Sequence, residues 1–535
     1  MTSRQRWTLV ATVIGSGAVF LDGTIVNVAL KSIGEELPAS VVNVLEGQNY
    51  VVSGYFAVLA ALLILSGGLS DHYGRRRIYT LGLIGFAATS ALCGLAPTLE
   101  WLIVFRLLQG AAGALLIPGS IALITHAFDG PERGRAFGIW AASTSALIVA
   151  GPIIGGILVD TIGWRVAFLV NVPILAVALW ATRRYVVESR DTEGTGRFDW
   201  LGALVATLAI GGLSFGLIRG EAKEWQDPVA WAAFAIGVVC LVAFPILMAR
   251  RKDPLVPLSL FRSRAFSSIN LATFFIYGAL YTTLLYQALV LQGVLGYSAL
   301  AAGVVGIPSG LMLSLLSTRI GTVAGRTGAR PFLVAGPLIM GAGLLWWARL
   351  PADSAPWLAS VSDPASLIPP ASVFVDVLPA ILLFGTGISF VVAPLTTTLM
   401  GSVSGRFSGV ASAINNSISR VGSPLLGAIV FIVVTATFYS VLGSLVPGMD
   451  TSQPDVRSMF QPLNPAPAGA TAVEIAAQRQ ASIDAFHVAS LINAGLLVVG
   501  AAISFVGLRA TPSAAPSELA AETLEPTEPP VAASV

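Results

Sequence analysis

Residues 7–30 read WTLVATVIGSGAVFLDGTIVNVAL, and this stretch decides the fold. It carries a single charged side chain, Asp22. About 20 consecutive apolar residues are enough for a helix to cross the hydrocarbon core of a bilayer, and a helix satisfies its own backbone hydrogen bonds there. We therefore predict that this stretch is a transmembrane helix with an acidic residue inside it.

The rest of the chain repeats the same pattern. Of its 535 residues, 55% are hydrophobic and only 11% are charged, which is typical of a protein that is dissolved in lipid. A β-barrel would instead show strands of about ten residues with alternating polarity. With the first run included, we predict about fourteen transmembrane helices in an all-α polytopic membrane protein. The further apolar runs are Tyr50–Leu69, Ile78–Ala96, Leu102–Thr125, Phe137–Val159, Trp164–Ala181, Trp200–Ile218, Pro228–Met248, Ile269–Leu291, Leu300–Leu316, Pro331–Ala348, Leu378–Met400, Ser408–Val434 and Ala485–Val506.

The chain also contains an internal repeat. The segment from Gly67 to Arg76 matches the segment from Gly321 to Arg330 at three positions with an offset of 254 residues. The fifth and thirteenth runs share five residues at an offset of 271. Both partners lie eight runs later, so we predict two six-helix repeats separated by two additional helices. Parallel repeats with a site between them are the architecture of alternating-access transporters.

These observations define the predicted domains. They are an N-terminal six-helix bundle at 1–181, two additional helices with flanking loops at 182–268, a C-terminal six-helix bundle at 269–510 with long outer loops near 351–376 and 445–484, and a disordered cytoplasmic tail at 511–535. The segment 445–484 is rich in proline and alanine and is interpreted as a disordered linker. Most of the 30 lysine and arginine residues fall on the side of the N-terminus, which places both termini in the cytoplasm.

Three charged residues lie well inside the predicted helices, namely Asp22, Arg106 and Arg420. Ionisable residues at such depth are expensive and mark candidate functional sites. Asp22 and Arg106 lie at similar depths, so their pairing would hold Asp22 ionised and its loss would favour protonation, which makes a proton switch. The alternative is a permanent salt bridge that only fixes two helices. Arg420 has no acidic partner in any run, and it either binds an anionic substrate group or caps backbone carbonyls.

Two glycine-containing motifs suggest mechanical roles. In the loop after the second run, Asp71 either caps the next helix or belongs to a cytoplasmic latch between the two halves. The residues of this candidate gating loop are Gly67, Asp71, Gly74, Arg75 and Arg76. In the fifth run, glycine and proline bend the helix and let a neighbour approach closely. The residues of this candidate packing motif are Gly151, Pro152, Gly155 and Gly156.

The order of these motifs resembles the fourteen-span drug:proton antiporter branch of the major facilitator superfamily. The resemblance is carried by residues 21–30, the Asp71 loop, Arg106-Leu-Leu-Gln109-Gly110, Gly151-Pro152 and the segment from Gly163 to Pro173. It implies the major facilitator fold, proton coupling at Asp22 and Arg106, inward closure by the Asp71 loop, and export signalled by Gly151 and Pro152. It departs from the family pattern at Lys31, His72 and Gly325.

We therefore expect a secondary active efflux transporter in a bacterial inner membrane, which exchanges protons for a small amphipathic organic compound such as a drug or antibiotic. The expected partners are that substrate, protons and the lipid bilayer, with no nucleic acid, and we expect a monomer. The proton gradient is the energy source, and we expect no cofactor, metal site or enzymatic activity. Candidate cavity residues are Gln109, Gln287, Asn415, Asn416 and Arg420. The alternatives are a dedicated exporter of an endogenous metabolite or lipid, and a transporter-like membrane sensor.

Overall fold

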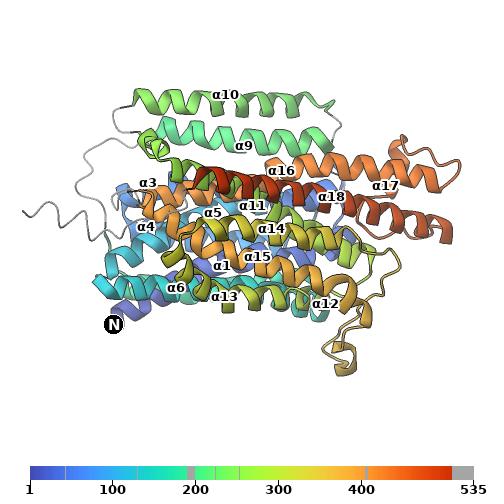
Figure 1. Ribbon diagram of the computed structural model, residues 1–535, viewed down its shortest axis with the longest axis horizontal. Helices are drawn as coiled ribbons and strands as arrows, with labels where there is room; N and C mark the ends of the chain where they lie inside the picture. Colours follow the sequence, from blue (N-terminus) through green and yellow to red (C-terminus); the bar gives the residue numbers. More distant parts are fainter. Residues whose placement is uncertain are drawn as a thin grey trace, which may run out of the picture.

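The computed structural model describes residues 1–42, 44–128, 130–189, 199–222, 225–251, 254–403 and 408–508. Within these ranges the chain is built of helices and contains no β-strand (Figure 1). Eleven helices in this part of the chain are long and apolar enough to cross a membrane. All fourteen predicted apolar runs lie in helical segments. The all-α polytopic class is confirmed, and the count of fourteen spans stays a prediction.

The N-terminal half begins with a helix that the sequence caps. The Thr2 hydroxyl accepts a hydrogen bond from the Gln5 backbone amide, and the Gln5 side chain accepts one from the Thr2 amide, which forms a capping box. A π-helical turn, Tyr50–Gly54, joins α2 to α3. The helices of this half are α1 (Ser3–Glu36), α2 (Val44–Asn49), α3 (Tyr55–Tyr73), α4 (Arg75–Gly94), α5 (Leu99–Ala127), α6 (Gly130–Thr161), α7 (Trp164–Leu169) and α8 (Asn171–Tyr185).

The remaining helices form the additional pair and the C-terminal half. The pair consists of α9 (Trp200–Ala222) and α10 (Pro228–Arg250). Short 3-10 or π-helical turns cover Leu258–Arg262, Val290–Val294, Pro364–Leu367 and Val373–Val377. The helices of the C-terminal half are α11 (Arg264–Leu289), α12 (Ala299–Val304), α13 (Ile307–Thr327), α14 (Arg330–Trp347), α15 (Leu378–Gly401), α16 (Ser408–Leu445), α17 (Pro454–Met459) and α18 (Ala472–Gly507).

The internal repeat is visible in the backbone. Gly74 ends α3 with a φ of 108°, and its repeat partner Gly328 ends α13 with a φ of 93°. Both values lie in the left-handed region that favours glycine. The residues that match at the offset of 271 also occupy equivalent places, because Gly151 of α6 packs on α1 and its partner Gly422 of α16 packs on α11. Equivalent glycines therefore make equivalent contacts in the two halves.

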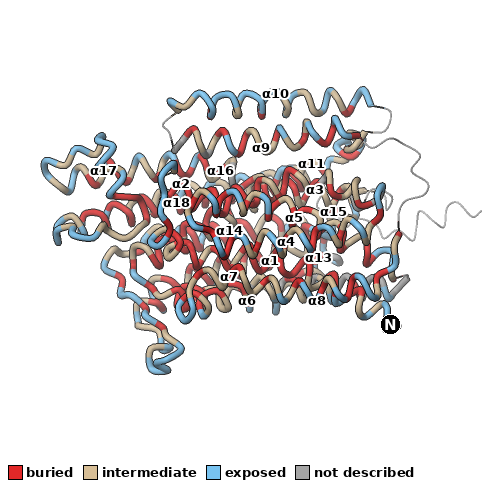
Figure 2. Tube along the Cα trace, turned by 180° about the vertical axis from the view of Figure 1, so that it is seen from behind, coloured by how far each residue is buried: buried red, intermediate tan, exposed pale blue. Residues whose placement is uncertain are grey.

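The additional helices lie along one flank of the bundle. Figure 1 shows α10 outermost and α9 between it and the rest of the protein. The apolar side chains of α10 point outward, as Val239 and Val242, which are 65% and 60% exposed, illustrate. Figure 2 shows the same contrast between an exposed α10 and a buried interior. Such a surface is stable only against lipid, so α10 is a membrane-facing helix.

The segment 445–484 is folded in the described chain, so its interpretation as a disordered linker is wrong. Helix α16 continues to Leu445 and α18 begins at Ala472, so both extend beyond the predicted spans, with α17 between them. Tyr439 donates from its hydroxyl to the carbonyls of Arg457 and Phe460, and Leu463 is fully buried. The predicted tail at 511–535 lies outside the described residues.

Candidate functional site

Asp22 and Arg106 form a buried ion pair inside the N-terminal half. Nη1 of Arg106 lies 2.5 Å from Oδ2 of Asp22, and the two side chains are 1% and 0% exposed. Asp22 lies on α1 and Arg106 on α5, two helices that pack against each other. Burying two charges is unfavourable unless they pair and the remaining polar atoms find partners.

Two amides complete the coordination of the Asp22 carboxylate. Its Oδ1 atom accepts hydrogen bonds from Nε2 of Gln109 and Nδ2 of Asn171, each 3.1 Å long. Arg106 Nη1 also donates to Oε1 of Gln109 at 2.7 Å. Gln109, expected on the cavity wall, therefore lies beside the ion pair. Asn171, which the sequence argument did not single out, is held by a further hydrogen bond to the Ser90 hydroxyl at 3.1 Å.

The rest of the Arg106 guanidinium is satisfied by α3 and the turn that precedes it. Its Nε donates to the carbonyl oxygen of Val51 at 3.0 Å, and its Cζ lies 4.0 Å from the centroid of the Tyr55 ring. The Val51 carbonyl is available because the π-helical turn Tyr50–Gly54 interrupts the α-helical hydrogen-bond ladder. The cluster therefore links α1, α3, α5 and α8.

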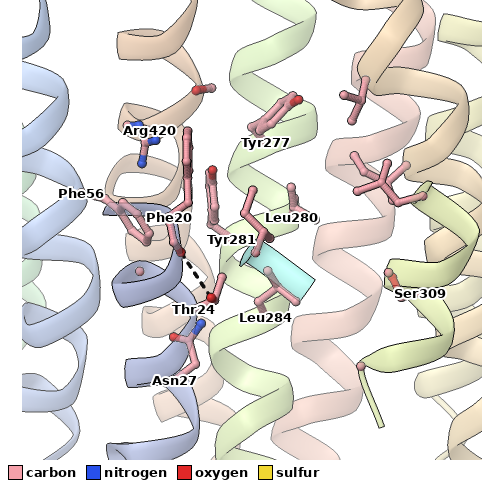
Figure 3. Close-up of a pocket in the computed structure, with 18 of the residues that line it drawn as sticks. Phe20, Thr24, Asn27, Phe56, Tyr277, Leu280, Tyr281, Leu284, Ser309 and Arg420 are labelled. Carbon is pink, nitrogen blue, oxygen red and sulfur yellow. Dashed lines mark hydrogen bonds between the residues drawn. The ribbon is translucent and has the colours of Figure 1, made fainter. Parts of the chain in front are cut away.

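A cavity of about 390 Å³ lies between the two halves. Its walls come from α1, α3 and α6 on one side and from α11, α12, α13, α15 and α16 on the other. Most of its lining is apolar, which suits the body of an amphipathic organic molecule. Figure 3 shows Phe20, Phe56, Tyr277, Tyr281 and Arg420 around it.

Four of the five predicted cavity residues line this space, namely Gln287, Asn415, Asn416 and Arg420. The amide of Asn415 is already used, because it donates to Oδ1 of Asn270 and Oγ1 of Thr273 at 3.1 and 2.9 Å. The cavity is also lined by Asn27, Tyr277 and Tyr281, which were not predicted from the sequence. One signal was available for Asn27, since it follows Asp22 by five residues in the same apolar run.

The two halves contact each other at one end of the cavity, where α6 meets α12. An added Cβ at Gly156 would lie 2.6 Å from the carbonyl oxygen of Ala299 and 2.6 Å from the Cα of Leu300. The Asp160 carboxylate accepts hydrogen bonds from the backbone amides of Ala299 and Leu300 at 3.1 and 2.7 Å. The first turn of α12 thus receives a carboxylate cap from the other half. We call this closed end the Asp160 face.

The other predicted packing residues act on α1 and α12. An added Cβ at Gly155 would lie 2.7 Å from Cγ2 of Val28, and Gly151 lies against the side chain of Thr24. Pro152 lines the cavity, and its carbonyl lies against Gly303. The motif therefore brings α6 close to both α1 and α12. At the opposite end the cavity extends to Leu399 and Met400, where α15 ends.

The candidate gating loop lies at that opposite end. The Glu188 carboxylate accepts a hydrogen bond from the backbone amide of Arg76 at 3.0 Å and forms an ion pair with Arg77 at 3.7 Å. An added Cβ at Gly74 would lie 2.7 Å from Oε1 of Glu188, whereas one at Gly67 would meet no atom within 4 Å. The Asp71 side chain lies outside the described residues. Glu188, which lies in a polar connection, had no signal in the sequence.

Comparison with known proteins places this geometry in context. Residues 12–428 match the family model of the Major Facilitator Superfamily. The multidrug resistance protein Stp of Mycobacterium tuberculosis (strain CDC 1551 / Oshkosh) is 32% identical over 85% of this chain and 80% of its own length. The tetracenomycin C resistance and export protein of Streptomyces glaucescens is 32% identical over 78% of this chain and 74% of its own length. The fold also matches a bacterial homologue of the human lysosomal transporter Spinster, which was solved in an inward-facing and unoccupied conformation. The TM-score is 0.60 at 18% sequence identity, and the match covers 95% of this chain and 97% of that chain.

Proposed function

The chain belongs to the major facilitator superfamily and is a membrane transporter rather than an enzyme, and we propose that it exports an amphipathic organic compound in exchange for protons. The relatives named above are resistance and export proteins, which supports efflux of a drug or antibiotic. The single observation that carries proton exchange is the buried carboxylate of Asp22 next to the cavity.

Helix α1 is the link between that carboxylate and the substrate site. Phe20, Gly23 and Thr24 line the cavity, whereas Asp22 of the same turn points to α5 and α8. A substrate in the cavity therefore presses on the turn that holds Asp22. A small displacement of α1 toward α5 and α8 would tighten the contacts of Asp22 with Arg106, Gln109 and Asn171, and the proton would then leave the Asp22 carboxyl.

The proposed cycle uses two states of the Asp22 carboxyl. When the Asp160 face is open, Asp22 accepts a proton from outside and its hold on Arg106 weakens. When that face is closed and substrate occupies the cavity, Asp22 releases its proton and holds Arg106 in the ion pair described above. Substrate enters from the end near Met400 and leaves through the Asp160 face after the switch. One proton thus moves inward on the carboxyl while the organic compound moves outward.

The proposed location is a bacterial inner membrane with both termini in the cytoplasm. Support comes from the excess of lysine and arginine on the N-terminal side and from the bacterial relatives. In this orientation the Asp71 loop and the end near Met400 face the cytoplasm, and the Asp160 face points outward. The proton gradient across such a membrane is directed inward, as export by exchange requires.

Proton movement in everted membrane vesicles tests this proposal. A pH-sensitive dye inside vesicles that carry the protein should report alkalinisation of the lumen when a transported amphiphile is added after acidification. Asp22→Asn should abolish that response, because the amide cannot carry the proton, while its amount in the membrane stays as in the wild type. A full response in Asp22→Asn would refute the assignment of Asp22.

A further inference from the structure

The cavity contains one unsatisfied positive charge. Arg420 lines it from α16 and is 3% exposed. Within the part of the chain that the structure describes, its Nε has no hydrogen-bond partner and no carboxylate forms an ion pair with the guanidinium. A buried cation that lacks a partner is costly, because its desolvation is not offset. The site therefore retains an unused capacity for an anion.

Comparison with Arg106 shows how unusual the surroundings of Arg420 are within this molecule. Both arginines are buried at similar exposure, 1% and 3%. Arg106 has a carboxylate, a side-chain amide and a backbone carbonyl as partners. Among the described residues, the partners of Arg420 are the faces of two aromatic rings, with its Cζ 5.6 Å from the centroid of Phe20 and 5.5 Å from that of Phe56. Cation–π contacts at such distances are weak and supply no acceptor for the N–H groups of the guanidinium.

The position of Arg420 suits recognition rather than packing. Phe20 lies on α1 and Phe56 on α3, so the guanidinium from α16 sits where the two halves meet at the cavity wall (Figure 3). Asn416 lies one turn earlier on the same helix and also lines the cavity. Tyr277 and Tyr281 of α11 line the same cavity and offer flat apolar surface, and the Tyr281 ring lies 5.0 Å from that of Phe56. A guanidinium donates two parallel hydrogen bonds to a carboxylate or sulfonate.

We propose that Arg420 binds an anionic group of the substrate, and that the cavity favours amphipathic anions with an aromatic or apolar body over cations. Arg420 is the one charged residue among the described lining of this cavity, and no aspartate or glutamate accompanies it there. A quaternary ammonium compound would meet a like charge, and the faces of Phe20 and Phe56 that could hold it already contact the guanidinium. The inference rests on the proposed function only in taking this cavity as the substrate site.

Direct binding to the purified full-length protein tests the inference without a proton gradient. The probes are three compounds with the same dansyl group and a six-carbon chain, which ends in a carboxylate, a methyl group or a trimethylammonium group. Fluorescence titration gives the Kd of each. We expect the wild type to bind the carboxylate probe at least about tenfold more tightly than the trimethylammonium probe, as a buried charge-assisted hydrogen bond would provide.

Three variants separate charge recognition from a structural role. Arg420→Gln should lose about tenfold in affinity for the carboxylate probe but less than about threefold for the neutral probe. Arg420→Lys should keep the preference for the anion, which also covers the case in which the glutamine variant does not fold. Arg319→Gln, at an exposed position of α13, removes the same charge elsewhere and should bind all three probes as the wild type does.

The outcomes distinguish this inference from the proposed exchange of protons. Equal affinity of the wild type for the anionic and cationic probes would overturn it, and so would an unchanged preference in Arg420→Gln. A preference for the anion that depends on Arg420 supports it, whatever the vesicle experiment shows. Absence of proton movement in vesicles would then refute the antiport while leaving recognition by Arg420 in place.

Discussion

Gly156→Ala is expected to hold the transporter open at the Asp160 face. The new Cβ would lie 2.6 Å from the carbonyl oxygen of Ala299 and from the Cα of Leu300. These are backbone atoms of the opposite half, so they cannot rotate away as a flexible side chain would. Overpacking of this kind costs about 1–3 kcal/mol, which lowers the population of the closed face about 5- to 150-fold.

Cysteine labelling measures that shift. Asn27→Cys places a reporter on the cavity wall, in a background where Cys93 and Cys240 are replaced by alanine. A membrane-impermeant maleimide added outside intact cells should label the reporter faster by about the same factor in the Gly156→Ala variant. The control is Gly211→Ala on α9, because an added Cβ there meets no atom within 4 Å.

The control also removes an intrinsic effect of the substitution. Alanine stabilises a helix by about 1 kcal/mol relative to glycine, and this gain is common to both variants. Labelling of the Gly156→Ala variant at the wild-type rate would refute the assignment of α6 and α12 as the closing contact. Equal acceleration by Gly211→Ala would show that the effect does not come from the interface.

Two further predictions concern the gating loop and the carboxylate cluster. Gly74→Ala should lower the melting temperature of the purified protein, because its φ of 108° costs a non-glycine residue about 1–3 kcal/mol and its Cβ would meet Glu188. Gly67→Ala, inside α3 and with no atom within 4 Å of the added Cβ, should not lower it, and equal melting temperatures of the two variants would contradict this. Asn171→Leu removes a donor to the Asp22 carboxylate at 3.1 Å, and losing a hydrogen bond to a buried charged group costs about 1.5–3 kcal/mol, so this variant should also melt at a lower temperature than the wild type. A melting temperature equal to that of the wild type would refute this role of Asn171.

The sequence predicts the helices well because the bilayer imposes them. Each apolar run has to satisfy its backbone internally, so length and hydropathy alone indicate a helix. The same logic fails outside the membrane, where the segment 445–484 folds through contacts that hydropathy does not encode. Leu463 is buried there against Gly293, and Gln478 donates to the carbonyls of Gln461 and Asn464.

The candidate site was predictable to the extent that charge is rare in lipid. Asp22, Arg106 and Arg420 were identified because ionisable residues at depth are few. Their partners were harder to find. Gln109 follows Arg106 by three residues, so helical spacing could have placed it beside the ion pair. Asn171 begins α8 within the segment from Gly163 to Pro173, but it had no predicted role, and the packing of α8 against α1 brings it to Asp22. Glu188 lies in the connection after α8, and the course of the chain there brings it to the gating loop.

Proton release on substrate binding tests the coupling most directly. Purified protein in weakly buffered detergent solution, at a pH where proton exchange is half-maximal in vesicles, is mixed with a compound that moves protons in those vesicles, and a pH indicator counts the protons released per bound molecule. We expect release by the wild type and binding without release by Asp22→Asn. Equal release by the two proteins, or binding to the wild type with no release, would contradict the claim that Asp22 couples the proton to the substrate.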